Sequence, residues 1–246
     1  MKNRVLIIGA TSAIAREAAR LWAARGEVLY LMGRSTERLQ ALAEDLKIRG
    51  ASDARWSVLD FDDYAGHRAA ILGAQQTMNG LDLALIAHGA LPNQEACQED
   101  FDNAQAALAA NFLSFASLLT HLANHFEKQR HGRIGAITSV AGDRARKSNY
   151  VYAAAKSGAS AWLEGLRGRM ALAGVTVTNI KPGYVDTPMT AHLPKNALFA
   201  SASRVGAGAV AALDRGAATV YLPWFWRPIM ALARVVPGRI FHRLNV

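Results

Sequence analysis

The segment Tyr152-Ala153-Ala154-Ala155-Lys156 carries the two residue types that an acid–base step requires. Residues four positions apart lie on one face of a helix, so we expect Tyr152 and Lys156 to point the same way. An ammonium group beside a phenol favours the phenolate, which predicts a lowered pKa for Tyr152 and a role as general acid or base. The same spacing also occurs on ordinary surface helices, so the hypothesis depends on the rest of the chain.

A second candidate site lies at the start of the chain. Arg4-Val5-Leu6-Ile7-Ile8 is a run of strand-forming residues, and a turn of small residues, 9–15, follows it. A strand, a tight turn and a helix place a pyrophosphate at the helix N-terminus. Gly9 is the one glycine kept of the three typical of such turns, and the methyl group of Ala13 could crowd the phosphates. The alternative is a turn that only packs a helix on a sheet.

The order of elements predicts the fold class. Apolar runs typical of strands alternate with helical patterns, which indicates βαβ units and a single doubly wound, mainly parallel sheet of the Rossmann-like α/β type. The strands are expected near residues 4–8, 27–32, 55–59, 82–87, 133–138, 175–180 and 217–222. The helices are expected near residues 14–25, 36–48, 63–79, 100–128, 150–172 and 202–215.

Ligands of such sheets bind beyond the carboxyl ends of the strands. Polar and small residues stand directly after most of the predicted strands, so we expect them to share one edge of the sheet. They are Ser12, Gly33, Arg34, Asp60, Gly89, Ser139, Pro182 and Gly183.

With these motifs in place, the chain resembles the short-chain dehydrogenase/reductase family over residues 1–222. The resemblance implies that Tyr152 protonates the substrate oxygen during reduction and that Lys156 lowers the pKa of Tyr152 and holds the nicotinamide ribose. It implies that Ser139, in Ile137-Thr138-Ser139-Val140-Ala141-Gly142, donates a hydrogen bond to the substrate oxygen. Asn111, in Asn111-Phe112-Leu113-Ser114, would hold a water that links Lys156 to a proton relay.

The family's cofactor lies along the same edge of the sheet. The turn Lys181 to Pro188 would lie against the nicotinamide, with Val185 and Thr187 at its carboxamide, and residues 187–201 would form the substrate loop. The resemblance assigns cofactor binding to Gly9, Thr11, Ser12, Ile14, Arg34, Ser35, Asp60, His88, Gly89, Tyr152, Lys156, Pro182, Gly183, Val185 and Thr187. It assigns no residue to a metal.

The charge after the second strand bears on the choice of cofactor. An acidic residue there binds the ribose of NAD, whereas an arginine accommodates a 2′-phosphate. The chain has Arg34 and Ser35 at this place and no acid, so we expect NADP(H). An exposed arginine at a helix start is the alternative interpretation. Asp60 is similar to the family acid that meets the adenine amino group.

One departure from the family pattern follows the fourth predicted strand. Relatives often have Asn-Asn-Ala-Gly there, and this chain has Ile86-Ala87-His88-Gly89. His88 could approach the cofactor ribose or could be a structural histidine with a partner in the core. Together with Ala13, this change suggests a divergent branch of the family.

Composition narrows the setting of the protein. The chain has 246 residues, 51% of them hydrophobic, which suffices for one α/β domain with a sizeable core. The single cysteine, Cys97, is expected in a polar loop; it excludes an intrachain disulfide and fits a reducing compartment. We expect no signal peptide before the first strand and no membrane-spanning run, hence a cytoplasmic protein.

The formal net charge of +9 indicates a negatively charged binding partner. No nucleic-acid-reading motif accompanies it, which makes nucleic acid an unlikely partner. Residues 223–246 form a separate tail that is aromatic, aliphatic and rich in arginine, without an acid. Such helices lie at anionic membrane surfaces, with Trp224 and Trp226 as the expected anchors. The alternative is a tail that packs on the interface of a homodimer or homotetramer.

The tail points to a substrate class. A reductase at the inner face of the cytoplasmic membrane suits a lipid-like ketone, and the chain resembles the branch that reduces the 2-keto group of a polyprenyl-phosphate-linked pentose. A 3-keto sphingoid base, a 3-oxoacyl chain or a soluble 3-oxoacyl thioester are the alternatives. A protein of another class, a non-catalytic NADP(H)-binding scaffold or sensor at the membrane, has Ala13 and His88 in its favour and the complete set of Ser139, Tyr152, Lys156 and Asn111 against it.

Overall fold

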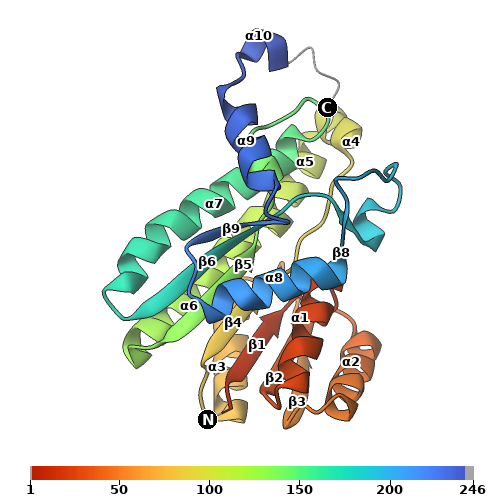
Figure 1. Ribbon diagram of the computed structural model, residues 1–246. Helices are drawn as coiled ribbons and strands as arrows, with labels where there is room; N and C mark the ends of the chain where they lie inside the picture. Colours follow the sequence, from red (N-terminus) through yellow and green to blue (C-terminus); the bar gives the residue numbers. More distant parts are fainter. Residues whose placement is uncertain (1, 242–246) are drawn as a thin grey trace.

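A computed structural model of the protein describes residues 2–241. One parallel sheet of seven strands runs through the molecule in the order β3-β2-β1-β4-β5-β6-β9 (Figure 1). Its strands are β1 (Arg4–Ile8), β2 (Val28–Gly33), β3 (Asp53–Val58), β4 (Leu83–Ile86), β5 (Gly132–Ile137), β6 (Val175–Pro182) and β9 (Thr219–Leu222). Each of the seven strands lies within two residues of its predicted place, and the doubly wound α/β architecture is confirmed.

Helices cover both faces of the sheet, as a parallel sheet requires. One layer contains α1, α2 and α8, and the other contains α3, α6 and α7 (Figure 1). Their bounds are α1 (Ala13–Ala24), α2 (Thr36–Ile48), α8 (Ala202–Asp214), α3 (His67–Met78), α6 (Ser114–Gln129) and α7 (Tyr150–Ala171).

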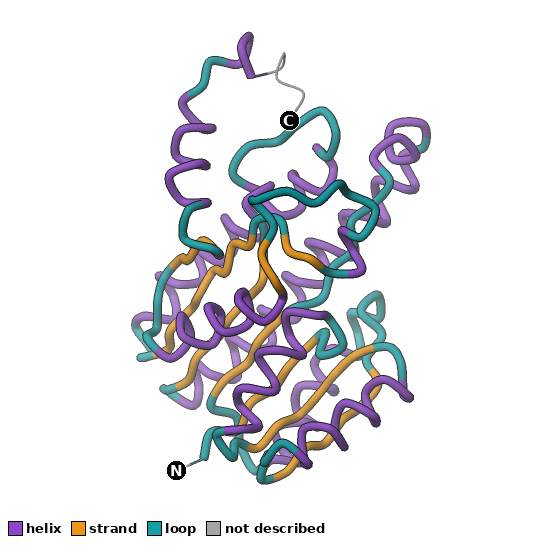
Figure 2. Tube along the Cα trace, turned by 45° about the vertical axis from the view of Figure 1, so that its right-hand side comes forward, coloured by secondary structure: helices purple, strands orange, loops and turns teal. Residues whose placement is uncertain are grey.

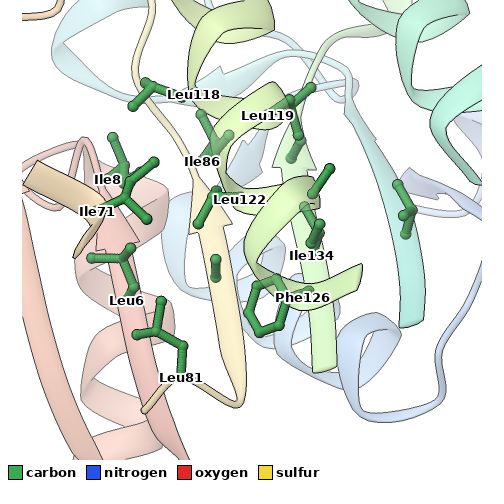
Figure 3. Packing of buried hydrophobic residues seen from close by; sticks show 14 of the residues in the cluster. Leu6, Ile8, Ile71, Leu81, Ile86, Leu118, Leu119, Leu122, Phe126 and Ile134 are labelled. Atoms are coloured by element: carbon green, nitrogen blue, oxygen red, sulfur yellow. The ribbon is translucent and has the colours of Figure 1, made fainter. Parts of the chain in front are cut away.

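The core consists of two apolar layers that alternate strand residues supply. Along β1, Leu6 and Ile8 face α3 and α6, whereas Val5 and Ile7 face α1 and α8. Figure 3 shows the first of these layers, in which side chains of α6 lie over the middle strands. Both faces of the strands are buried, which explains why they read as continuous apolar runs rather than as alternating ones.

Serine side chains set the beginnings of the helices that follow the strands. The Ser12 Oγ accepts the Ala15 amide at 3.3 Å, and the Ser35 Oγ accepts the Arg38 amide at 3.3 Å. These caps satisfy backbone donors that have no partner inside the helix. They fix where α1 and α2 begin, directly beyond the carboxyl ends of β1 and β2.

The predicted helix 100–128 is interrupted. It consists of α5 (Phe101–Leu108), a π-helical turn (Ala109–Leu113) and α6. Together, Phe101–Gln129 is the one helical stretch among the described residues that is long and apolar enough to cross a membrane by length and composition. Its apolar face, with Phe115, Leu122 and Phe126, lies in the core, so the stretch packs as a core helix.

Three short elements were not predicted. Cys97 lies buried in α4 (Gln94–Glu99), so its expected place in a polar loop was wrong. The strands β7 (Val185–Asp186) and β8 (Ala200–Ser201) pair in parallel and close the base of the predicted substrate loop. Between them the chain forms a short 3₁₀ turn, Pro188–Thr190, and otherwise irregular backbone, as the sequence indicated.

The tail folds back on the domain. It forms α9 (Trp226–Val235) and α10 (Gly238–Phe241), and the rest of the predicted tail, 242–246, lies outside the described residues. Figures 1 and 2 show α9 beyond the carboxyl edge of the sheet. The expectation that Trp226 is a membrane anchor was wrong, because its indole is 5% exposed and packs with Val140 and Met230. Trp224, in contrast, is 72% exposed.

Candidate active site

A close contact between a loop and a helix brings the predicted catalytic residues together. Ser139 follows β5 and caps the 3₁₀ turn Val140–Gly142. A Cβ on Gly142 would lie 2.7 Å from the carbonyl carbon of Lys156, so only a glycine lets this turn touch the backbone of α7. The contact places the loop of Ser139 against the turn of α7 that carries Tyr152 and Lys156.

Tyr152 and Lys156 lie on the same face of α7, as predicted. The Lys156 Nζ is 5.7 Å from the centroid of the Tyr152 ring and 5.7 Å from that of Phe115. Its described hydrogen bond is a long one, 3.5 Å, to the carbonyl oxygen of Ile137. A buried ammonium with so weak a partner can bind an additional acceptor.

Burial dominates the electrostatics of this pair. It raises the pKa of Tyr152 to about 12, against a smaller lowering by the hydrogen bond with Ser139. Burial also lowers the pKa of Lys156 to about 8. The expected lowering of the Tyr152 pKa by Lys156 was therefore wrong for this structure. A phenol that stays protonated at neutral pH is nonetheless the form needed by a proton donor.

Asn111 and Gly89 complete this part of the site. Asn111 is buried in the π-helical turn, where its Nδ2 donates to the carbonyl oxygens of Ala90 and Ala107, both at 2.9 Å. Its Oδ1 accepts the Ala90 amide at 3.1 Å. Gly89 has a φ of +152°, and a Cβ there would lie 2.9 Å from the Asn111 Oδ1 and 3.2 Å from the Lys156 Nζ. The amide thus holds the loop after β4 in place beside Lys156, and a water held by Asn111 stays a prediction.

The turn after β1 has the shape expected of a phosphate-binding turn. Gly9 has a φ of +79°, and a Cβ on it would lie 2.5 Å from the backbone nitrogen of His88. Thr11 and Ser12 lie at the N-terminus of α1, partly exposed, and Ala13 and Ile14 begin the helix. Backbone N–H groups of a helix N-terminus are an anion-binding arrangement, which fits a pyrophosphate.

Three side chains form a stack beyond β2 and β4. The guanidinium of Arg34 lies 5.9 Å from the ring centroid of Phe61, and this ring stacks on His88 at 4.4 Å. Arg34 is exposed, next to Ser35 at the cap of α2. The exposed Asp60, next to Phe61, accepts the Asp62 amide at 3.0 Å. Phe61 was missed by sequence reasoning, although its position after the predicted cofactor acid was a usable signal.

His88 is buried among aromatic side chains. Its Nε2 lies 3.0 Å from the Ser114 Oγ, whereas its Nδ1 is buried with no described partner. Desolvation lowers its pKa to about 3, so the imidazole is neutral. A structural role for His88 in the core explains the contact of its Nε2 with Ser114 but gives no partner for its Nδ1 among the described residues. Contact of His88 with the cofactor stays a prediction.

The turn after β6 packs against β9 and the tail. The Gly183 amide donates to the Leu222 carbonyl oxygen at 3.0 Å, and a Cβ on Gly183 would overlap the indole of Trp226. Val185 is buried in β7, and Thr187 begins the 3₁₀ turn of the substrate loop. The contact of Trp226 from the tail with this turn was not predicted from the sequence. The absence of a side chain at Gly183 was the one sign that another group packs closely there.

The comparison with protein families agrees with this geometry. The short chain dehydrogenase family model matches residues 3–198, most of the chain. An uncharacterized oxidoreductase of Mycobacterium tuberculosis is 32% identical over 240 residues, which cover 98% of this chain and 96% of that protein. The protein belongs to the short chain dehydrogenase family, oxidoreductases that bind a nicotinamide cofactor.

Solved structures share the fold at lower identity. The gluconate 5-dehydrogenase of Burkholderia cenocepacia, determined with NADP and tartrate, superimposes with a TM-score of 0.83 at 21% identity and covers 93% of this chain and 96% of its own. A variant of actinorhodin polyketide ketoreductase with NADPH has a TM-score of 0.79 at 20% identity and covers 89% of this chain and 94% of its own. At these identities the likeness shows the fold alone.

The residues present fit a dinucleotide. Gly9 lets the turn that leads into the N-terminus of α1 pack on the backbone of His88, and Gly89 leaves room for the Lys156 ammonium beside the Asn111 amide. Lys156 is a buried cation whose one hydrogen bond among the described residues is 3.5 Å long, and Arg34 is an exposed cation directly after β2. The arrangement offers two cations and a helix N-terminus to a negatively charged group, and the Tyr152 hydroxyl is hydrogen-bonded to Ser139.

Proposed function

We propose that the protein is an NADP(H)-dependent oxidoreductase that reduces a ketone to an alcohol, with Tyr152 as the proton donor. The observation that carries the proposal is the contact of the Ser139 turn with α7 at Lys156, because it joins the serine, tyrosine and lysine in one site. A scaffold or sensor would have no need for a neutral phenol beside a buried lysine.

Each residue has a defined task in this reaction. The bound nicotinamide supplies the hydride. Ser139 and Tyr152 donate hydrogen bonds to the carbonyl oxygen, and Tyr152 then transfers its proton from Oη to that oxygen. Lys156 supports the transfer by stabilising negative charge on the phenol. Asn111 holds Gly89 and Ala90 in the position that leaves room for the Lys156 ammonium.

The preference for NADP(H) is supported by the charges at the end of the site. Arg34 provides a planar donor fork that suits a 2′-phosphate. Phe61 lies against its guanidinium, and His88 lies on the other side of Phe61, so the stack limits where the arginine can go. No carboxylate stands in the turn Gly33-Arg34-Ser35 to accept the ribose hydroxyls of NAD.

A lipid-like substrate is supported by a group of aromatic rings at the turn after β6. Tyr184 stacks on Phe199 at 5.2 Å and meets Trp226 edge to face at 5.6 Å. These rings join the substrate loop, the turn after β6 and α9 in one apolar surface. We propose a lipid-linked ketone such as a polyprenyl-phosphate keto-sugar. A soluble 3-oxoacyl thioester or another small ketone is the second candidate, which the same apolar surface would also accept.

The outer face of the tail supports contact with an anionic membrane at the cytoplasmic surface. Trp224, Leu232 and Val235 are exposed apolar side chains on or beside α9. Arg227 and Arg239 are exposed on the same segment, and Arg243 lies outside the described residues. Apolar side chains flanked by arginines suit a headgroup region with negative charge. Only this outer face is available, since Trp226 and Met230 are buried.

We also propose that the protein is a homodimer or homotetramer. A groove of about 350 Å³ on α6 and α7 is lined by Thr120, Ala161, Trp162, Gly165, Leu166 and Arg169. Trp162 is 42% exposed there, a large aromatic surface that a second copy could cover. Light scattering behind a sizing column tests this proposal, and a monomer mass at micromolar concentration would contradict it.

The first test of the function is a fluorescence titration with NADPH and, separately, with NADH, followed by NADPH oxidation assays. The ketones should include a polyprenyl-phosphate keto-pentose, a 3-oxoacyl thioester and 9,10-phenanthrenequinone as a non-physiological probe. We expect micromolar binding of NADPH, much weaker binding of NADH and the fastest turnover on the lipid-linked ketone. Absence of binding to both dinucleotides would overturn the proposal, and fastest turnover on the thioester would favour the second candidate.

A further inference from the structure

A buried carboxylate lies four residues after Ser139 and has no part in the reaction described above. The Asp143 side chain is 3% exposed and forms an ion pair with the Lys181 ammonium, which is 10% exposed. Its Oδ2 accepts a hydrogen bond from the Tyr221 hydroxyl at 2.7 Å. A buried charge is costly unless it is paired, and here it has partners from two strands, β6 and β9.

The helix α9 extends this cluster to the surface. The Arg234 Nη2 donates to the Tyr221 hydroxyl at 2.8 Å and lies 3.5 Å from the Asp143 Oδ2. Arg144, the next residue along the loop, donates to the carbonyl oxygens of Arg234 and Val236, both at 3.1 Å. Its guanidinium also lies 4.4 Å from the ring centroid of Phe241. The C-terminal end of α9 is therefore tied to the loop 143–144 from both directions.

Both segments held by this cluster carry proposed site residues. Asp143 is joined to the turn of Ser139 by its own amide, which donates to the Val140 carbonyl oxygen at 3.0 Å. Lys181 directly precedes Pro182 and Gly183, the turn proposed to face the nicotinamide. At its other end, α9 packs Trp226 against Gly183 and Val140. The helix α9 thus contacts the serine loop at both of its ends and the proline–glycine turn at its first residue.

We propose that Asp143 is a positioning residue of the active site, and that α9, through Arg234 and Tyr221, sets the relative placement of the Ser139 loop and the Gly183 turn. The tail is then part of the catalytic unit as well as a surface. The effect on turnover rests on the proposed function, whereas the mechanical link between α9 and the two loops does not.

The test uses the exposed end of the cluster, because removing Asp143 or Lys181 would leave a buried charge without its partner and endanger folding. Arg234 is 52% exposed, so Arg234→Gln should fold. Tyr221→Phe keeps the ring and leaves Asp143 paired with Lys181, so it should fold as well. The control is Arg25→Gln, which removes a 2.7 Å ion pair with Asp214 outside the site. Arg234→Lys keeps the charge and serves as the conservative variant.

The first readout is hydrogen–deuterium exchange of the full chain, which needs neither cofactor nor substrate. In Arg234→Gln and Tyr221→Phe, amides in residues 139–144 and 182–187 should exchange at least about fivefold faster than in the wild type. Arg25→Gln should not change them, and Arg234→Lys should restore most of the protection. Faster exchange confined to α9 would overturn the proposal.

The second readout separates binding from turnover with NADPH and 9,10-phenanthrenequinone. A misplaced Ser139 loop should lower kcat about tenfold, while the Kd of NADPH changes less than about twofold. An unchanged kcat in both variants would contradict the positioning role. If the wild type itself neither binds NADPH nor reduces a ketone, the proposed function fails, and the exchange result still decides whether α9 holds the two loops.

Discussion

Two glycines stand at opposite ends of the site, and each is crowded by a different kind of neighbour. At Gly9 the obstacle to a side chain is the backbone of His88, which the sheet fixes between β4 and the loop after it. At Gly183 the obstacle is the indole of Trp226, a side chain from the C-terminal helix. The proposed phosphate side is therefore built from backbone, and the proposed nicotinamide and substrate side is built from side chains that a distant segment supplies.

This difference indicates which side of the site can change its shape through substitutions among relatives. A backbone contact cannot be relieved by substitution of the neighbour, because every residue has the same backbone. A side-chain contact can be relieved by a smaller neighbour. The substrate side can therefore be reshaped through α9 without disturbing the sheet, whereas the phosphate side cannot.

The largest effects on the free energy of unfolding are expected from alanine substitutions at these two glycines, and they test directly whether the two contacts differ. Gly9→Ala places a Cβ against backbone at a left-handed φ, and we expect a loss of about 3 kcal/mol or more in the free energy of unfolding. Gly183→Ala meets a side chain instead, and its cost should be about 1–3 kcal/mol. Urea denaturation of both variants measures these values, and NADPH titration should show lost binding for Gly9→Ala.

The neighbours provide the control for this pair. In a Trp226→Leu background, Gly183→Ala should cost less than about 0.5 kcal/mol, a non-additive result. In a His88→Ala background, Gly9→Ala should keep its full cost, because the clash is with backbone. Rescue of Gly9→Ala by His88→Ala would contradict the distinction drawn here.

The pH dependence of the reduction rate tests whether the charge on the buried Lys156 is needed. Burial lowers the Lys156 pKa to about 8, so the side chain carries its proton below that pH and loses it above. Reduction consumes a proton through Tyr152, and we expect the rate to fall about tenfold per pH unit above pH 8. Stopped-flow measurement of NADPH oxidation from pH 6 to pH 10 gives the profile. A flat profile to pH 10 would show that the charge on Lys156 does not support the transfer.

Arg34→Ala tests whether this side chain determines the preference for NADPH over NADH. Loss of a charge-assisted donor should weaken NADPH binding by about 1–3 kcal/mol, which is about fivefold to 150-fold in Kd. The Kd of NADH should stay within about twofold, since NADH has no 2′-phosphate. Arg38→Ala, an exposed arginine one helical turn further on, is the matched control. Equal weakening of both dinucleotides would refute the role of Arg34 in cofactor choice.

The smallest effect is expected on the outer face of the tail. Trp224→Ala should reduce binding to liposomes with anionic lipids a few-fold and leave the melting temperature unchanged, because the indole is 72% exposed. Flotation on a density gradient at low and high salt measures the binding. Leu172→Ala, which removes an exposed leucine at the C-terminal cap of α7, is the control. Equal flotation of the wild type and Trp224→Ala would contradict the proposal that this face of the tail binds the membrane.

Local patterns predict the sheet and the helix that carries Tyr152 and Lys156 well. The strand runs are apolar throughout because both faces are buried, and Tyr152 and Lys156 share a face through helical spacing alone. The raised pKa of Tyr152 was not predictable, since it depends on how deeply the completed fold buries the phenol. Trp226 was misplaced for a similar reason, because an amphipathic composition does not show which face of a helix the domain covers.

Long-range side-chain contacts could not be predicted. The stack of Arg34, Phe61 and His88 joins three separate loops, and the Asp143 cluster joins a loop, two strands and α9. No spacing rule connects such residues along the sequence. The two-residue pairing of β7 and β8 is likewise too short to leave a pattern.

The central claim is that Tyr152 protonates the substrate in a site that binds NADPH, and Tyr152→Phe tests it most directly. The variant removes one hydroxyl and keeps the ring against Lys156, so NADPH should bind with a Kd within about twofold of the wild type. Turnover of the best ketone should fall by at least about a thousandfold. Half of the wild-type rate in Tyr152→Phe, with NADPH bound normally, would contradict the assignment of the proton donor and the account built on it.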